Sequence, residues 1–188
     1  YPYLVNKRYF TEGYQNKLAC FKFVPDNAVS APTIFTNIGA HPTIVDEETT
    51  LLSADFPAFM EAKINDEGMN FMFIQGAQAP VSVNKWAELP EITVSEVEAE
   101  IAVNPTAEDY KTAILFGYEY ARLILEAQNN AKEVEPILNV RMTEYALPLE
   151  TGLLSFGAIE GFIGTTTVED CSSSTGYSVI TEAGYIEI

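Results

Sequence analysis

The sequence predicts an α/β fold in which a mixed β-sheet is flanked by helices. Apolar runs of strand length alternate with a run at helical spacing over residues 19–74. The length of 188 residues suits one large domain, or one domain with a fragment of another. With 47% apolar and 20% charged residues, the chain is apolar enough to bury a core and is not a disordered segment.

The first part of the chain predicts the order strand, helix, strand. Residues 19–24 alternate as ACFKFV, and residues 33–40 form a second apolar run after a turn. Ser53 stands at an N-cap position, with Asp55 in the first turn and apolar residues at helical spacing up to Gly68. Residues 70–74, NFMFI, have the length of a strand rather than of a helix.

Such a unit most often contains two parallel strands joined by a crossover helix. The carboxyl ends of both strands and the amino end of the helix then open on one edge of the sheet, where α/β proteins usually bind ligands. We therefore expect His41, residues 53–55 and residues 76–78 to share that edge.

The rest of the chain is less regular. Residues 79–105 contain three prolines and many acids, which indicates a surface excursion with at most a short strand. Thr106 is expected to cap the longest helix, which runs to about Ala131. Beyond it we expect an extended stretch at 137–149, an apolar segment at 153–163, a Ser/Thr-rich loop at 165–175 and two β-like runs at the end. Because the chain starts without Met and stops in an alternating run, we expect the fold to be incomplete at both ends.

Charge and composition exclude several classes of partner. Asp and Glu total 27 against 10 Lys and Arg, so a nucleic acid is not expected as a partner. An acidic surface favours a neutral or cationic small molecule over an anionic one. No run of about 18 apolar residues occurs, so we expect no integral membrane segment. Cys20 and Cys171 lack the spacing of a metal or redox pair; they form one long-range bridge or, the reading we favour, are two small buried hydrophobes.

His41 is the only histidine and follows a run of small residues at the end of a predicted strand. It is either a ligand or base at the open edge, or a structural, hydrogen-bonded imidazole. Asp55 either accepts the ring N–H of His41 or satisfies the start of the helix.

The turn Gln75, Gly76, Ala77, Gln78 lacks bulky side chains, so its amides either face a substrate oxyanion or simply form a turn.

Three segments carry a family resemblance. FTNIGAHPTIV (35–45), LLSADFP (51–57) and FMFIQGAQ (71–78), in this order and spacing, resemble the N-terminal catalytic domain of neutral/alkaline non-lysosomal ceramidases and their bacterial relatives. Residues 6–9, 145–164 and 181–188 also resemble parts of that domain, so the resemblance covers nearly the whole chain. It implies that residues 1–188 are the central and C-terminal portion of the domain, from a secreted or cell-surface protein.

The resemblance implies a zinc-dependent amidase whose metal is bound by two His, one Glu and one Tyr. His41 matches the second zinc histidine, and the other three ligands would lie outside this chain. The catalytic serine of the family aligns with Pro80; Ser82, two places later, is either its replacement or an ordinary loop hydroxyl.

The predicted function is therefore part of a zinc-dependent amidohydrolase that cleaves the N-acyl bond of a small or lipid-like amide, completed by the remaining polypeptide. The alternative is a non-catalytic secreted binding or structural module that retains the fold. The oligomeric state stays open.

Overall fold

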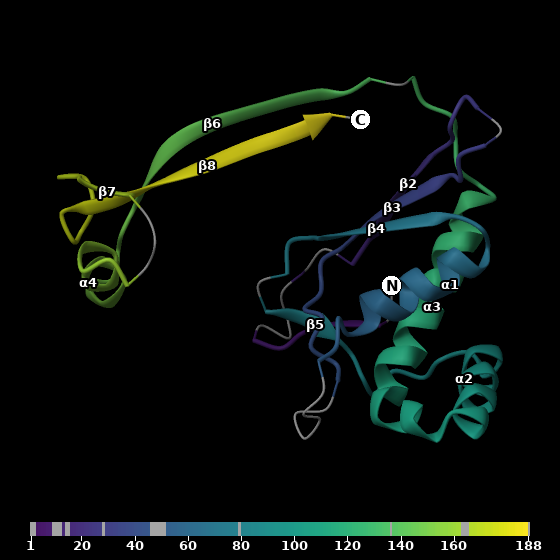
Figure 1. Ribbon diagram of the computed structural model, residues 1–188. Helices are drawn as coiled ribbons and strands as arrows, with labels where there is room; N and C mark the ends of the chain where they lie inside the picture. Colours follow the sequence, from purple (N-terminus) through teal and green to yellow (C-terminus); the bar gives the residue numbers. More distant parts are fainter. Residues whose placement is uncertain are drawn as a thin grey trace. The chain divides into compact units, whose positions relative to one another are not determined.

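The computed structural model describes residues 3–8, 13, 16–27, 29–45, 52–78, 80–135, 137–162 and 166–187. The chain divides into two compact units, Tyr1–Ala131 (unit 1) and Lys132–Ile188 (unit 2). Both units contain helices and strands, which confirms the predicted α/β class (Figure 1).

Unit 1 is built on a mixed three-stranded sheet. Its strands are β2 (Leu18–Phe23), β3 (Thr33–Ile38) and β4 (Asn70–Gln75), in the order β2-β3-β4. β2 is antiparallel to β3, and β4 is parallel to it. The helix α1 (Phe56–Asp66) lies between β3 and β4 in the sequence, so the predicted strand, helix, strand unit with a parallel pair is confirmed.

A second, two-stranded sheet pairs β1 (Leu4–Asn6) with β5 (Val81–Val83) in antiparallel fashion. The chain reaches it directly from the end of β3, because His41 forms an isolated parallel bridge with Ser82. The N–H of His41 donates to the carbonyl of Val81 at 3.1 Å. The two sheets of unit 1 therefore meet at the carboxyl end of β3.

The prediction of a surface excursion over 79–105 was wrong for its second half, which is the helix α2 (Glu91–Val103). Only Thr93 and Val97 of α2 are buried, so its apolar stripe is too faint to be read from the sequence. Pro90 is the N-cap of α2, and Pro105 lies beyond its end, at the start of the next helical turn. Neither proline interrupts α2, since proline is tolerated at a helix start.

Thr106 does not cap the longest helix. It lies in a 3₁₀ turn, η1 (Pro105–Tyr110), where its hydroxyl donates to Asn104 Oδ1 at 2.7 Å. The long helix α3 (Lys111–Gln128) begins after this turn.

The core of unit 1 lies where α1 packs on α3, and both helices lie on one side of the three-stranded sheet (Figure 1). Phe56 packs against Tyr120 with ring centroids 5.5 Å apart. The helices approach closely at Gly117, where an added Cβ would lie 2.5 Å from the Cβ of Phe59. The buried side chains of these helices include Met60, Ile64, Phe116 and Ile124.

Unit 2 contains β6 (Asn139–Pro148), α4 (Gly152–Ile159), β7 (Thr166–Glu169) and β8 (Tyr177–Glu187). The strands form an antiparallel sheet in the order β6-β8-β7. The extended stretch is confirmed, the apolar segment is the helix α4, and the Ser/Thr-rich loop holds β7 in place of a continuous loop. The two expected runs at the end are the single strand β8; residues 163–165 and 188 lie outside the described residues.

Both cysteines are free thiols. Cys20 is half-buried, and burial raises the pKa of its thiol. Cys171 is exposed, so the description of two buried hydrophobes was wrong for this residue. No helix in the described ranges has the length and apolar character needed to cross a membrane.

Candidate functional site

The end of β3 lies against the turn that follows β4. The N–H of Gly76 donates to the carbonyl of Ile38 at 2.9 Å. The side-chain amide of Gln75 donates to the carbonyls of Ile38 at 3.1 Å and Ala40 at 2.9 Å. The carboxyl ends of the two parallel strands therefore share one edge, as the crossover argument predicts.

Close backbone approach explains the small residues at this edge. A Cβ on Gly39 would lie 2.6 Å from the carbonyl oxygen of Ala77, and one on Gly76 would lie 2.9 Å from the backbone nitrogen of Gly39. The amide of Gly76 and the side chain of Gln75 are both engaged with β3. These two residues therefore hold the turn to the sheet, which is the structural alternative to an oxyanion-binding turn.

The other two residues of the turn differ from them. Ala77 is exposed. Gln78 is half-buried, and its side-chain Oε1 is buried with no hydrogen-bond partner in the part of the chain that the structure describes.

Asp55 is the N-cap of α1, a position that the sequence assigned to Ser53. Its Oδ1 accepts from the N–H of Phe56 at 2.7 Å, and its Oδ2 accepts from Ile44 at 2.7 Å and Val45 at 2.8 Å. Ser53 Oγ accepts from the N–H of Asp55 at 2.9 Å. The described hydrogen bonds of the Asp55 carboxylate come from backbone amides, so the helix-start role is the one that the geometry supports.

An isolated parallel bridge pairs His41, which follows β3, with Ser82 of β5. Ser82 is buried in strand β5, so the alternative that it is an ordinary loop hydroxyl is wrong. Directly paired residues of neighbouring strands place their Cβ atoms about 5 Å apart. The predicted metal ligand and the candidate serine are therefore neighbours.

A pocket of about 290 Å³ opens beside β5. It is lined by Lys7, residues 43–45, Ser82, Val83, Lys85 and Trp86. The ammonium group of Lys85 lies 5.4 Å from the centroid of the Trp86 ring. The sequence did not single out Lys7, Lys85 or Trp86, because only the pairing of β1 with β5 brings them to one place.

The fit to a zinc ion can be tested on the candidate ligands. Within the described ranges, no group of three or more His, Cys, Asp or Glu side chains is placed to hold a metal ion. A catalytic zinc takes three protein ligands, and both Asp55 oxygens already accept backbone amides. The described residues by themselves therefore do not fit a zinc centre.

A buried carboxylate that the sequence analysis did not single out is Glu119, on α3. Its Oε1 accepts from Arg122 Nη2 at 2.7 Å and the Tyr3 hydroxyl at 3.1 Å. Its Oε2 accepts from Arg122 Nε at 2.9 Å and Thr93 Oγ1 at 2.8 Å. Burial by itself raises the pKa of Glu119, but the hydrogen bonds from Arg122, Thr93 and Tyr3 outweigh it and hold the pKa below its ordinary value.

Each oxygen of Glu119 accepts two hydrogen bonds, so its acceptor capacity is largely used. Such a group stays ionised and links Tyr3, which precedes β1, to α2 and α3; it is not poised to exchange a proton. The signal in the sequence was an acid on the buried stripe of α3, three residues before an arginine.

No family model, curated protein or solved structure matches the chain. A function for this protein therefore rests on its own residues and their arrangement.

Proposed function

We propose that unit 1 binds a small molecule in the pocket beside β5. The observation that carries this proposal is the pocket itself, which lies next to the shared edge of β3 and β4. Its lining combines hydroxyls from Thr43 and Ser82, two ammonium groups and an indole. Polar groups that converge beside apolar side chains can bind and orient a small molecule, and a volume of about 290 Å³ suits a compact ligand.

The walls of this pocket are held by backbone hydrogen bonds. The N–H of Lys7 donates to the carbonyl of Pro80 at 2.9 Å, and the N–H of Asn84 donates to the carbonyl of Tyr3 at 2.7 Å. Asp55 fixes the wall formed by Ile44 and Val45. A pocket with fixed walls loses little conformational entropy when it binds a ligand, which favours binding.

The pocket is tested with three one-ring compounds, 4-fluorobenzamide, 4-fluorobenzoate and 4-fluorophenyl phosphate. Trp86 is the only tryptophan, so its indole N–H gives a single resonance that reports on the pocket. At least one compound is expected to shift this resonance in a saturable way.

The matched variants are Thr43→Phe, which fills the pocket from an exposed lining position, and Thr106→Phe on the exposed η1 turn. Thr43→Phe should abolish the shift and Thr106→Phe should preserve it. Absence of any saturable shift, or binding unaffected by Thr43→Phe, would refute the proposal.

Amide hydrolysis is the second candidate, and the bridge between His41 and Ser82 favours it. In this candidate the chain is part of a secreted or cell-surface zinc-dependent amidohydrolase that cleaves an N-acyl bond. Ligands besides His41 would come from the remaining polypeptide, since the described residues do not complete a zinc site.

Two measurements test this candidate. Calorimetry on the 188-residue chain should find only weak zinc binding, because one ligand holds the ion poorly; tight stoichiometric binding that His41→Ala abolishes would show ligands that we have missed. In the longer protein, His41→Ala should abolish the cleavage of a fluorogenic N-acyl amide, and activity that survives this change would refute the candidate.

A further inference from the structure

We infer that the ligand of the pocket beside β5 carries an anionic group, a carboxylate or a phosphate, which binds the ammonium groups of Lys7 and Lys85. The inference rests on the proposed function of this pocket. It names the class of ligand, which the pocket volume alone does not.

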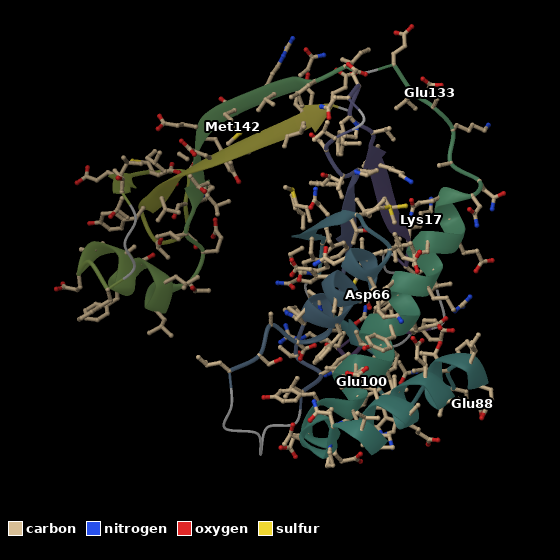
Figure 2. The ribbon with its side chains drawn as sticks, turned by 45° about the vertical axis from the view of Figure 1, so that its right-hand side comes forward. Lys17, Asp66, Glu88, Glu100, Glu133 and Met142 are labelled. Carbon is tan, nitrogen blue, oxygen red and sulfur yellow. The ribbon has the colours of Figure 1, made fainter. Side chains whose placement is uncertain are left out.

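Both ammonium groups are available for a ligand. The ion pairs of the described residues use Lys63, Lys111 and Arg122, and neither Lys7 nor Lys85 takes part in one. The described lining residues include no Asp or Glu. The marked acids Asp66 on α1 and Glu100 on α2 lie on other elements of unit 1 (Figure 2). In a chain with 27 acids and 10 bases, a pocket with two lysines and no acid in its described lining is a local reversal of charge.

The β1–β5 ladder places the two lysines at its opposite ends. Lys7 directly follows β1, and Lys85 follows β5 by two residues. Because the strands are antiparallel, the lysines reach the pocket from opposite ends of the ladder. Ser82, paired with Val5 at the middle of the ladder, lies between them and supplies a hydroxyl at the pocket wall.

The rest of the lining suits an organic body attached to the anion. The apolar lining residues are Ile44, Val45 and Val83. The ammonium group of Lys85 lies over the Trp86 ring. Indole rings contribute large, rigid contact area. An anion bound to Lys85 would therefore also change the surroundings of the indole.

The net charge of −17 does not forbid an anion at this place. At physiological salt, charges farther apart than about 8 Å are largely screened, so the nearest lysines dominate the local field. A single contact between an ammonium group and an anion at 4 Å in water changes affinity by about fivefold. The preference for a neutral or cationic ligand that the overall charge favours is reversed inside this pocket.

The test uses the whole chain and the three fluorinated compounds, with dissociation constants measured by ¹⁹F NMR and by the Trp86 indole resonance. The benzoate and the phenyl phosphate should bind at least about fivefold more tightly than the benzamide, which has the same ring and no charge. Lys7→Gln and Lys85→Gln should each weaken binding of the anions by about fivefold and leave the benzamide unchanged. Lys22→Gln, an exposed change on β2 outside the pocket, should alter neither.

The outcomes separate the two proposals. If the benzamide binds and the anions bind no more tightly, or if the two pocket lysines prove no more important than Lys22, the anionic inference is wrong and the pocket remains a binding site. If none of the three compounds shifts the Trp86 resonance, the proposed function itself is wrong. A tighter phosphate points to a phosphate ligand, and a tighter benzoate points to a carboxylate; both support the inference.

Discussion

Asp55 and Glu119 are buried carboxylates of unit 1, and each is held by a different kind of donor. Asp55 accepts hydrogen bonds from backbone N–H groups of two segments. Glu119 accepts hydrogen bonds from side chains, those of Tyr3, Thr93 and Arg122. A buried carboxylate is therefore not by itself a candidate catalytic group. The hydrogen-bond donors around it decide whether it has a structural or a catalytic role.

The backbone of Asp55 is strained, with φ 59° and ψ −154°. Essentially only glycine adopts this backbone conformation readily. Another residue held in it lowers the stability of the fold by about 1–3 kcal/mol. Asp55→Ala loses the helix cap and leaves the amides of Ile44 and Val45 unsatisfied, so the free energy of unfolding should fall by about 2 kcal/mol or more.

Asp55→Gly loses the same bonds but relieves the strain, so it should be less damaging than Asp55→Ala by about 1 kcal/mol. Urea unfolding followed by circular dichroism measures both. The control Asp66→Ala, an exposed change on the same helix, should lie within about 0.5 kcal/mol of the unchanged protein. Equal stabilities for Asp55→Ala and Asp55→Gly would contradict the strain argument.

Glu119→Gln should lower the free energy of unfolding by about 1–3 kcal/mol, because an amide cannot satisfy Arg122, Thr93 and Tyr3 together. Glu126→Gln is the matched control. Glu126 is the exposed partner of the same arginine, at 3.1 Å, and its loss should cost less than about 1 kcal/mol. Similar effects for the two changes would show that the buried network is unimportant.

We also expect the stability difference between the unchanged protein and Glu119→Gln to depend on pH. The pKa of Glu119 is lowered in the folded state, so the ionised carboxylate stabilises the fold above the unfolded pKa of about 4.3, and this advantage is lost as the pH falls through the lower folded pKa. The difference in stability between the unchanged protein and Glu119→Gln should be full above pH about 5 and shrink below pH about 4. Thermal melts across this range measure it, and a difference that grew on acidification would contradict the assignment.

At the scale of elements, the packing of α1 on α3 depends on Gly117. An added Cβ would lie 2.5 Å from the Cβ of Phe59 and 2.8 Å from the carbonyl oxygen of Phe56. Alanine favours a helix by about 1 kcal/mol over glycine, yet Gly117→Ala should destabilise unit 1 by about 1–3 kcal/mol, because α1 and α3 must move apart.

The control for this change is Gly152→Ala at the start of α4, where an added Cβ meets nothing within 4 Å. It should be neutral or slightly stabilising. Melting temperatures of the two variants measure the contrast, and a stabilised Gly117→Ala would show that the helices have room to spare.

At the scale of the whole molecule, the buried apolar clusters of the described residues lie within residues 1–131. Every residue of β6 is exposed, and the described part of unit 2 shows no cluster of this kind. Short chains without a core rarely fold alone.

Residues 1–131 produced alone should therefore unfold cooperatively, with a melting temperature within a few degrees of the whole chain. Residues 132–188 alone should show no cooperative transition. Calorimetry of both pieces tests this, and a cooperative transition in the second piece would contradict the argument from the core.

Local pattern determined much of unit 1. The alternation in 19–24, the apolar runs at 33–40 and 70–74 and the helical spacing after Asp55 are short-range properties, and they predicted β2, β3, β4 and α1. The crossover rule then placed the ends of β3 and β4 on one edge, because parallel strands joined by a helix have few other arrangements.

Only the tertiary structure decided the rest. Three contacts join residues that are far apart in the sequence: the bridge of His41 to Ser82, the pairing of β1 with β5, and the hydrogen bonds of Glu119. The local sequence around each residue does not indicate which distant residue it will contact. Helix α2 was missed for a related reason, since its weak apolar stripe becomes evident only against α3. The charge of the chain followed from composition alone, whereas the reversal of that charge in the pocket required the fold to place Lys7 and Lys85 in the lining of one pocket.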